Sequence, residues 1–116
     1  MKRFIESFTH AFDGLCYVWK EERNFRIQII IGIVLIVCMG MAGFSYLETG
    51  LIIIAITLVL TAETINTAFE DTLDKIEPNQ NAVIGRIKDI AAGVVVLCVF
   101  GAVVIGGMVF FSHYSF

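Results

Sequence analysis

Three long apolar runs constrain this chain more than any other feature. They occupy residues 27–46, 51–76 and 88–111, and the second is apolar through Ala62 before it becomes polar. Each run can cross a hydrocarbon core of about 30 Å as a helix. A water-soluble protein of 116 residues needs more polar surface than a chain that is 58% hydrophobic and 16% charged can supply. The sequence therefore predicts an all-α integral membrane protein with three transmembrane helices, forming one domain over residues 1–116.

The segment before the first run predicts a helix of another kind. Residues 1–22 carry apolar side chains at helical spacings of three and four, with charged side chains opposite them. These apolar residues are Phe4, Phe8, Ala11, Phe12, Leu15 and Trp19. Such a helix is expected to lie in the membrane interface, with Tyr17 and Trp19 as anchors. The alternative, a helix packed on soluble protein, has little soluble protein in this chain to pack on.

The positive charges predict the orientation. They fall either before the first span or between the second and the third, at Lys2, Arg3, Lys20, Arg23, Arg26, Lys75, Arg86 and Lys88. By the positive-inside rule, the N-terminus is cytoplasmic and the C-terminus lies outside the inner (plasma) membrane. The net charge of −3 and the lack of a basic stripe argue against nucleic acid as a partner. In the third span, Gly93, Gly101 and Gly106 are expected to let helices approach closely.

The second span carries the polar residues that are most informative about function. At 100° per residue, Glu63, Asn66, Glu70 and Asp74 fall within an arc of roughly 80° on one face of a helix. A carboxylate at membrane depth is costly unless it is paired or hydrated, so Glu63 is a functional candidate by default. No basic residue lies deep enough in the spans to neutralise it. A divalent cation is a natural candidate for that role.

Two further polar segments are expected at the same cytoplasmic level. Glu22 and Arg26 precede the first span, and Lys88 and Asp89 begin the third. Carboxylates and cations that meet at the membrane boundary predict a site for a metal–phosphate group beside a lipid headgroup. Simpler interpretations stay open at single positions: Lys88 as an interface anchor, Asp89 as a first-turn acid, and Glu22 as a solvated charge.

These residues resemble a known family. Residues 63–70 read Glu-Thr-Ile-Asn-Thr-Ala-Phe-Glu and are followed by Asp74; this is similar to the signature of the prokaryotic diacylglycerol kinase family, which includes undecaprenol kinases. Residues 22–26, Glu-Arg-Asn-Phe-Arg, resemble the family's segment before its first span. Residues 88–93, Lys-Asp-Ile-Ala-Ala-Gly, resemble the motif that opens its third. The resemblance covers essentially the whole chain.

The resemblance implies a homotrimer that phosphorylates the hydroxyl of a membrane lipid with ATP and a divalent cation, expected to be Mg²⁺, in sites shared between subunits. Glu63 would be the general base, and Asn66 would position the reacting groups. Glu22 and Glu70 would hold the metal. Four residues would serve the nucleotide: Asp74, Lys88, Asp89 and Arg26, the last through phosphate. The segments before the first and third spans look more like those of undecaprenol kinases, which favours undecaprenol over diacylglycerol as the substrate.

A different class of function also explains acids within a span. A small oligomeric transporter or channel could relay protons or bind a cationic solute through Glu63 and Glu70. It does not explain why polar residues from three segments collect at one level, and the outer halves of the spans offer almost no polar lining. A purely structural subunit would have no reason to keep buried acids without partners.

Overall fold

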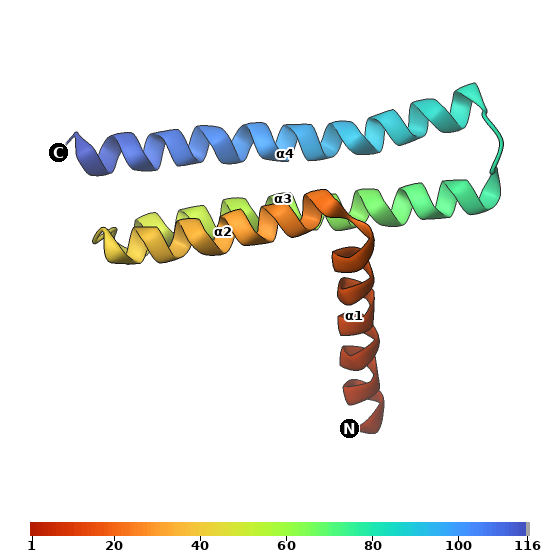
Figure 1. Cartoon of the computed structure of the whole chain (residues 1–116), viewed down its shortest axis with the longest axis horizontal. Coiled ribbons are helices and arrows are strands. Elements are labelled where there is room, and N and C mark those ends of the chain that lie inside the picture. The colour runs from red at the N-terminus through yellow and green to blue at the C-terminus, as the bar shows by residue number, and fades with distance from the viewer. Residues whose placement is uncertain (116) are drawn as a thin grey trace.

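The computed structural model describes residues 1–115, which form four helices. They are α1 (Lys2–Glu21), α2 (Arg23–Met41), α3 (Tyr46–Ile76) and α4 (Ala82–Tyr114). Helices α2 and α4 both pack on α3, and α1 runs crosswise to all three (Figure 1). Helices α2, α3 and α4 are long and apolar enough to cross a membrane. The prediction of an all-helical chain with three candidate spans is confirmed.

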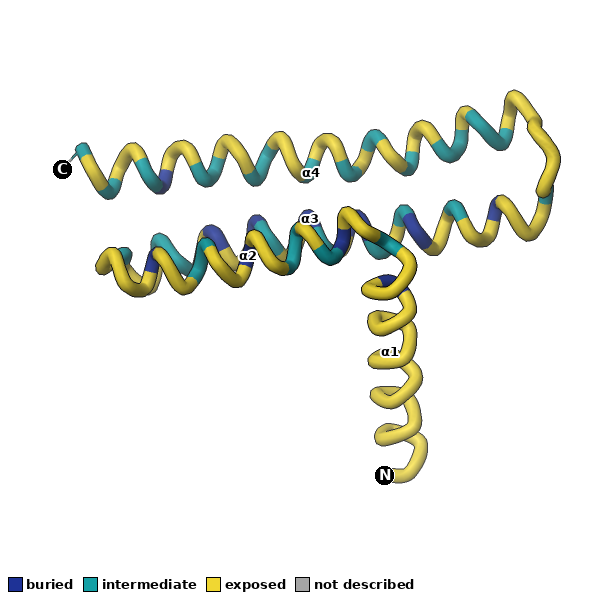
Figure 2. The backbone as a smooth tube through the Cα atoms, viewed as in Figure 1, coloured by how far each residue is buried: buried dark blue, intermediate teal, exposed yellow. Residues whose placement is uncertain are grey.

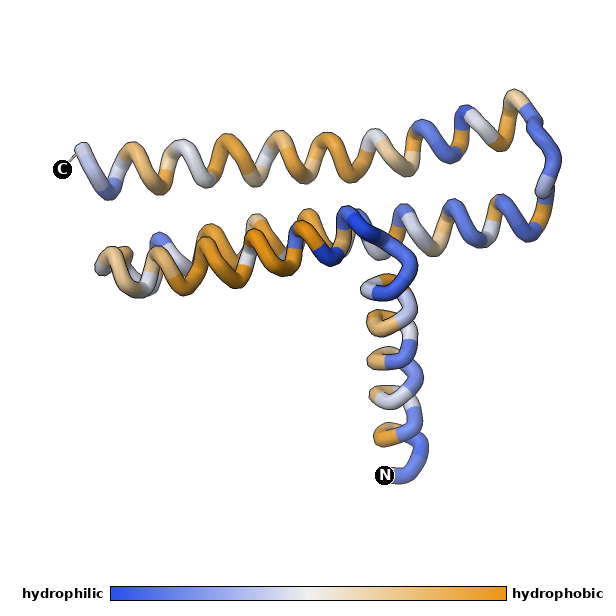
Figure 3. The backbone as a smooth tube through the Cα atoms, in the orientation of Figure 1, coloured by the Kyte–Doolittle hydropathy of each residue, from blue (hydrophilic) through white to orange (hydrophobic). Residues whose placement is uncertain are grey.

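The helix lengths show where the polar end of the molecule lies. At about 1.5 Å per residue, α2 is about 29 Å long, whereas α3 and α4 reach about 46 and 50 Å. A hydrocarbon core of about 30 Å is therefore matched by α2 and exceeded by the other two helices. The excess lies beyond the corner between α1 and α2, where Figure 3 shows hydrophilic residues on α3, on α4 and in the turn that joins them.

The connection between the first two spans differs from the prediction. The predicted spans leave residues 47–50 between them as a short connection, but α3 already begins at Tyr46 because Ser45 forms a capping box with Glu48. The Ser45 hydroxyl accepts from the Glu48 backbone N–H at 3.1 Å, and the Ser45 N–H donates to Glu48 Oε1 at 2.8 Å. Helix α2 ends earlier than residue 46, at Met41, since Gly43 takes a positive φ of 81° that turns the chain.

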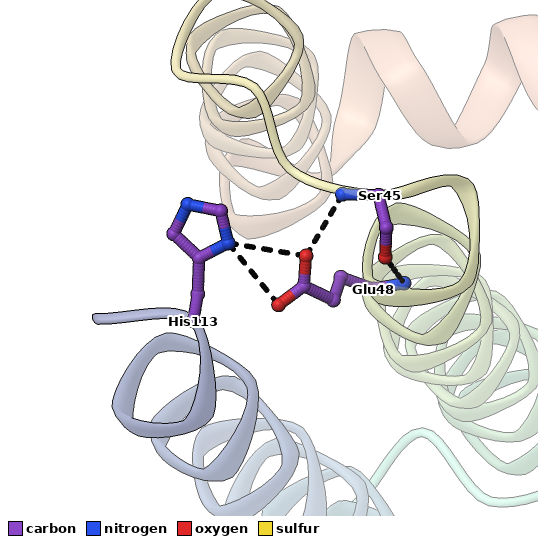
Figure 4. Close-up of polar contacts among 3 residues, drawn as sticks. All are labelled: Ser45, Glu48 and His113. Carbon is purple, nitrogen blue, oxygen red and sulfur yellow. Dashed lines mark hydrogen bonds and ion pairs between the residues drawn. The ribbon is translucent and has the colours of Figure 1, made fainter. Parts of the chain in front are cut away.

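A polar contact joins the start of α3 to the end of α4 (Figure 4). His113 Nδ1 donates to both Glu48 carboxylate oxygens, at 3.1 and 3.2 Å, and the two side chains are only 22% and 21% exposed. Phe44 stacks on the His113 ring, with ring centroids 3.8 Å apart. The hydrophobic core lies at this end as well, around Met39, Ile52 and Val109. This end of the molecule is therefore the well-packed one.

We expect His113→Ala to loosen the contact between the start of α3 and the end of α4. The change removes one bifurcated hydrogen bond to a carboxylate and one ring stack, both of which hold the two helices together. The melting temperature of the detergent-solubilised protein should fall, while Ser112→Ala, at an exposed neighbour, should leave it unchanged. Equal melting of the two variants would show that the contact does not stabilise the fold.

The close helix approach occurs at a glycine other than those predicted. Within residues 1–115, a Cβ added to Gly93, Gly101 or Gly106 would meet nothing within 4 Å. At Gly32, a Cβ would lie 3.1 Å from Cγ2 of Ile56. The three predicted glycines all lie on α4, whereas Gly32 lies on α2 where it crosses α3. Its missing side chain therefore sets the α2–α3 distance.

Helix α1 presents almost its whole surface to the surroundings. Val18 is its one buried residue among those described, and Figure 2 shows the helix exposed along its length. The phenylalanines of the predicted apolar face, Phe4, Phe8 and Phe12, are more than half exposed. Because nothing else in the described chain covers this face, it is suited to rest in the lipid interface, as the sequence predicts.

Candidate active site

The polar face of α3 begins with a buried acid. Glu63 is 5% exposed, and one turn later the Thr67 hydroxyl donates to the Glu63 backbone carbonyl at 3.0 Å. Asn66 donates from Nδ2 to Glu70 Oε1 at 3.3 Å, which holds that carboxylate in place. Asp74 is exposed farther along the helix. The predicted face thus runs from a buried end to an exposed end, with Asn66 tied to Glu70.

Glu22 completes a cluster of acids at the corner between α1 and α2. Its pKa is raised above its ordinary value, first by partial burial and then by the negative charges of Glu70 and Glu63. Glu22 is therefore partly buried and placed near other acids, which favours the predicted metal-binding role over the simpler interpretation as a solvated charge. Three carboxyl groups from two separate segments influence one another here. Within residues 1–115, none of the three forms an ion pair with a lysine or arginine.

The donor set suits a hard divalent cation, although the single chain does not complete a site. Carboxylate oxygens are the ligands that Mg²⁺ prefers, and the mutual repulsion of these acids would be relieved by a positive ion. In the described part of the chain, no group of three His, Cys, Asp or Glu side chains is close enough to hold a metal. Glu22 and Glu70 could supply part of the coordination, with phosphate oxygens and water supplying the rest.

Arg26 is engaged in building the corner. Its Nη1 donates to the backbone carbonyls of Trp19 and Lys20, at 2.7 and 2.9 Å. These are C-terminal carbonyls of α1, which lack partners within the helix. Across the same corner, the Asp71 carboxylate is the main cause of a raised pKa at Tyr17, so α1 also reaches α3. The structure therefore gives Arg26 a role in holding α1, and leaves contact with phosphate as a proposal.

Two of the four predicted nucleotide residues, Asp74 and Lys88, come together at the far polar end. Lys88 on α4 forms an ion pair with Asp74 on α3. Both line a polar pocket of about 170 Å³, whose other walls come mainly from the turn at residues 77–81. The Asn81 side chain shapes this turn by accepting from the backbone N–H groups of Val83 and Ile84. Asp89 is exposed at the next position on α4.

An apolar groove runs along the membrane-spanning part of the molecule. It has a volume of about 370 Å³ and is lined by residues of α2, α3 and α4, from Gln28 and Val59 at one end to Leu35 and Ile52 at the other. Gln28 is its one polar wall residue among those described. Val59 precedes Glu63 by one helical turn, and the Gln28 side chain lies against the Glu63 carboxyl group. The buried carboxyl group of Glu63 therefore lies beside the Gln28–Val59 end of a hydrocarbon-lined groove.

Known proteins resemble this chain over nearly its full length. The family described as prokaryotic diacylglycerol kinase matches residues 9–110. The chain belongs to this family. The undecaprenol kinase of Bacillus subtilis (strain 168) is 32% identical over 112 residues, covering 95% of this chain and 89% of the relative. The diacylglycerol kinase of Haemophilus influenzae is 31% identical over 113 residues, covering 96% and 95%.

Membership of the prokaryotic diacylglycerol kinase family identifies the chain as a multi-pass membrane lipid kinase. The relatives are all named as kinases, but their names give different lipids. The diacylglycerol kinase of Escherichia coli (strain K12) is 25% identical over 113 residues, covering 97% of this chain and 93% of the relative. The transporter or channel considered from the sequence is therefore not supported.

One residue of the candidate site escaped the sequence analysis. Gln28 is the strongly polar residue of the first span, and the rule that singled out Glu63 as an intramembrane polar group also applies to it. It was not predicted as a site residue because an uncharged amide is less costly in a membrane than a carboxylate. Only the packing of α2 on α3 shows that the two residues meet.

Proposed function

We propose that this protein transfers the γ-phosphoryl group of ATP to the hydroxyl of undecaprenol at the cytoplasmic surface of the membrane. The observation that carries the proposal is the buried Glu63 carboxyl group at the head of the apolar groove. A lipid alcohol that lies with its chain in the groove would bring its hydroxyl to this acid. The nucleotide would approach from the polar end, where Asp74 and Lys88 line the smaller pocket.

In this reaction Glu63 accepts the proton of the lipid hydroxyl. The hydroxyl oxygen forms a bond to the γ-phosphorus, the bond from that phosphorus to the β-phosphate oxygen breaks, and ADP leaves. Asn66 keeps Glu70 oriented through its hydrogen bond. Lys88 exchanges Asp74 for a phosphate oxygen, and Asp89 contacts the nucleotide. A Mg²⁺ ion held by Glu22 and Glu70 would neutralise phosphate charge.

The walls of the groove favour undecaprenol over diacylglycerol, in line with the resemblance of the segments before the first and third spans to those of undecaprenol kinases. These walls are hydrocarbon, apart from Gln28. An isoprenoid chain has no polar atom below its hydroxyl, whereas the ester carbonyls of diacylglycerol need hydrogen-bond donors that these walls do not supply.

The orientation and the assembly belong to the same proposal. Every lysine and arginine lies in α1, in the first turn of α2, near the end of α3 or in the first two turns of α4. The corner and the α3–α4 turn therefore face the cytoplasm, where ATP is found. The functional unit is a homotrimer with sites shared between subunits, as the resemblance implies. The acids that residues 1–115 bring together do not by themselves form a complete set of metal ligands, which is consistent with a shared site.

The substrate preference can be tested by competition. Purified protein in detergent with Mg²⁺–ATP should phosphorylate undecaprenol with a kcat/KM at least about tenfold that for diacylglycerol, the effect of one unsatisfied buried polar group. Ala102→Phe, which fills the groove, should raise the lipid KM and leave the KM for ATP unchanged. Ala92→Phe, on the exposed side of α4, is the matched control. Equal efficiency with both lipids would refute the preference.

A further inference from the structure

Gln28 carries an unsatisfied polar atom in the apolar part of the molecule. Its side-chain Oε1 is buried and has no hydrogen-bond partner within residues 1–115. Leaving such an acceptor unpaired in an apolar environment is unfavourable, and an apolar residue at this position would avoid that cost. An acceptor kept in this place is expected to receive a donor from a molecule that enters the site.

The position of Gln28 limits what that donor can be. The side chain lines the groove at the end nearest Glu63 and lies against the Glu63 carboxyl group. The other groove walls are Ala, Gly, Val, Leu and Ile side chains, which have no N–H or O–H to offer. A molecule that fits such walls is a hydrocarbon chain, and the donor that a simple lipid alcohol carries is its hydroxyl.

We propose that Gln28 is a specificity-determining residue that binds the hydroxyl of the incoming lipid alcohol and presents it to Glu63. This inference rests on the proposed function and identifies the side chain that recognises the substrate hydroxyl. The hydroxyl first donates its hydrogen bond to Gln28 Oε1. Rotation about the C–O bond of the lipid then directs the same proton toward the Glu63 carboxylate. No bond to Gln28 forms or breaks, so its contribution is to binding and selection.

The proposal distinguishes an alcohol from an ether of the same shape. Farnesol has an O–H that can donate to Gln28, whereas farnesyl methyl ether has none. Gln28→Met keeps the length and the helix propensity of the side chain but removes its acceptor. The variant should therefore weaken the binding of farnesol about tenfold, the effect of one hydrogen bond, and change the binding of the ether less than twofold.

The experiment measures equilibrium binding of tritiated farnesol and of tritiated farnesyl methyl ether to the full chain without ATP. Ile30→Met, on the lipid-exposed side of α2, is the matched control and should bind both ligands as the wild type does. If Gln28→Met weakens the binding of both ligands equally, Gln28 only shapes the groove. If the binding of both ligands is unchanged, Gln28 contacts neither. Either result overturns the proposal. No phosphate is transferred in this assay, so it tests the role of Gln28 separately from the kinase reaction. Failure of the proposed function would instead appear as absent lipid phosphorylation.

Discussion

Glu63→Gln is expected to lower the turnover of lipid phosphorylation by at least about 10²–10⁴-fold, the range over which general bases contribute. The glutamine has nearly the shape of the glutamate, but it cannot accept the proton of the lipid hydroxyl. Folding should survive, because the change removes a buried acid that has no ion-pair partner in the described chain. The measurement is the initial rate of phosphate transfer at saturating ATP and lipid, with melting temperature as the check on folding.

Glu6→Gln provides the matched control for this variant. Glu6 is an exposed acid on α1, far along the helix from the corner that holds the acid cluster. Its replacement changes the net charge by the same amount and should leave turnover unchanged. A folded Glu63→Gln protein with near-normal turnover would exclude Glu63 as the base.

Glu22→Gln and Glu70→Gln should each reduce transfer at least about 100-fold, since a metal ion supplies several kcal/mol of charge stabilisation in such reactions. They should also reduce the rise in melting temperature that Mg²⁺ and a nonhydrolysable ATP analogue cause in the wild type. The second readout separates lost metal binding from a general loss of activity. Asp13→Asn, at an exposed acid on α1, should keep most of the Mg²⁺-dependent rise.

Glu22→Gln should also change stability in the absence of metal. A raised carboxyl pKa means that the folded state holds its proton more tightly than the unfolded state does, so this group favours folding at low pH. Stability from this source declines as the pH rises from the ordinary value of about 4.5 through the raised pKa of Glu22. The metal-free variant should therefore melt at a higher temperature than the wild type at pH 8 and lose that advantage near pH 4. A lower melting temperature at pH 8 would contradict the repulsion between Glu22, Glu63 and Glu70.

The spans and the polar face of α3 could be predicted because both depend on local sequence. A run of apolar residues long enough for the bilayer specifies a helix wherever it lies in the chain. The spacing of Glu63, Asn66 and Glu70 fixes their common face once that helix forms. The start of α3 was misplaced because the apolar pattern outweighed the weaker signal of Ser45 and Glu48, which is nevertheless present in the sequence.

The contacts between helices could not be predicted in the same way. The Glu48–His113 contact joins residues 65 positions apart, and no local pattern specifies it. Gly32 meets Ile56, rather than any α4 glycine meeting a neighbour, because the crossing of α2 and α3 determines which small residue is needed. The meeting of Gln28 with Glu63 and the use of Arg26 to hold α1 likewise depend on the corner between α1 and α2.

The central claim is most directly tested by following the γ-phosphate of labelled ATP. Purified protein is incubated with Mg²⁺ and undecaprenol, and the lipid phase is extracted and analysed for labelled undecaprenyl phosphate. We predict labelled lipid when protein, ATP, Mg²⁺ and undecaprenol are all present, and none when any one of them is omitted. Well-folded protein that leaves undecaprenol unlabelled, or that releases the label only as inorganic phosphate, would contradict the account.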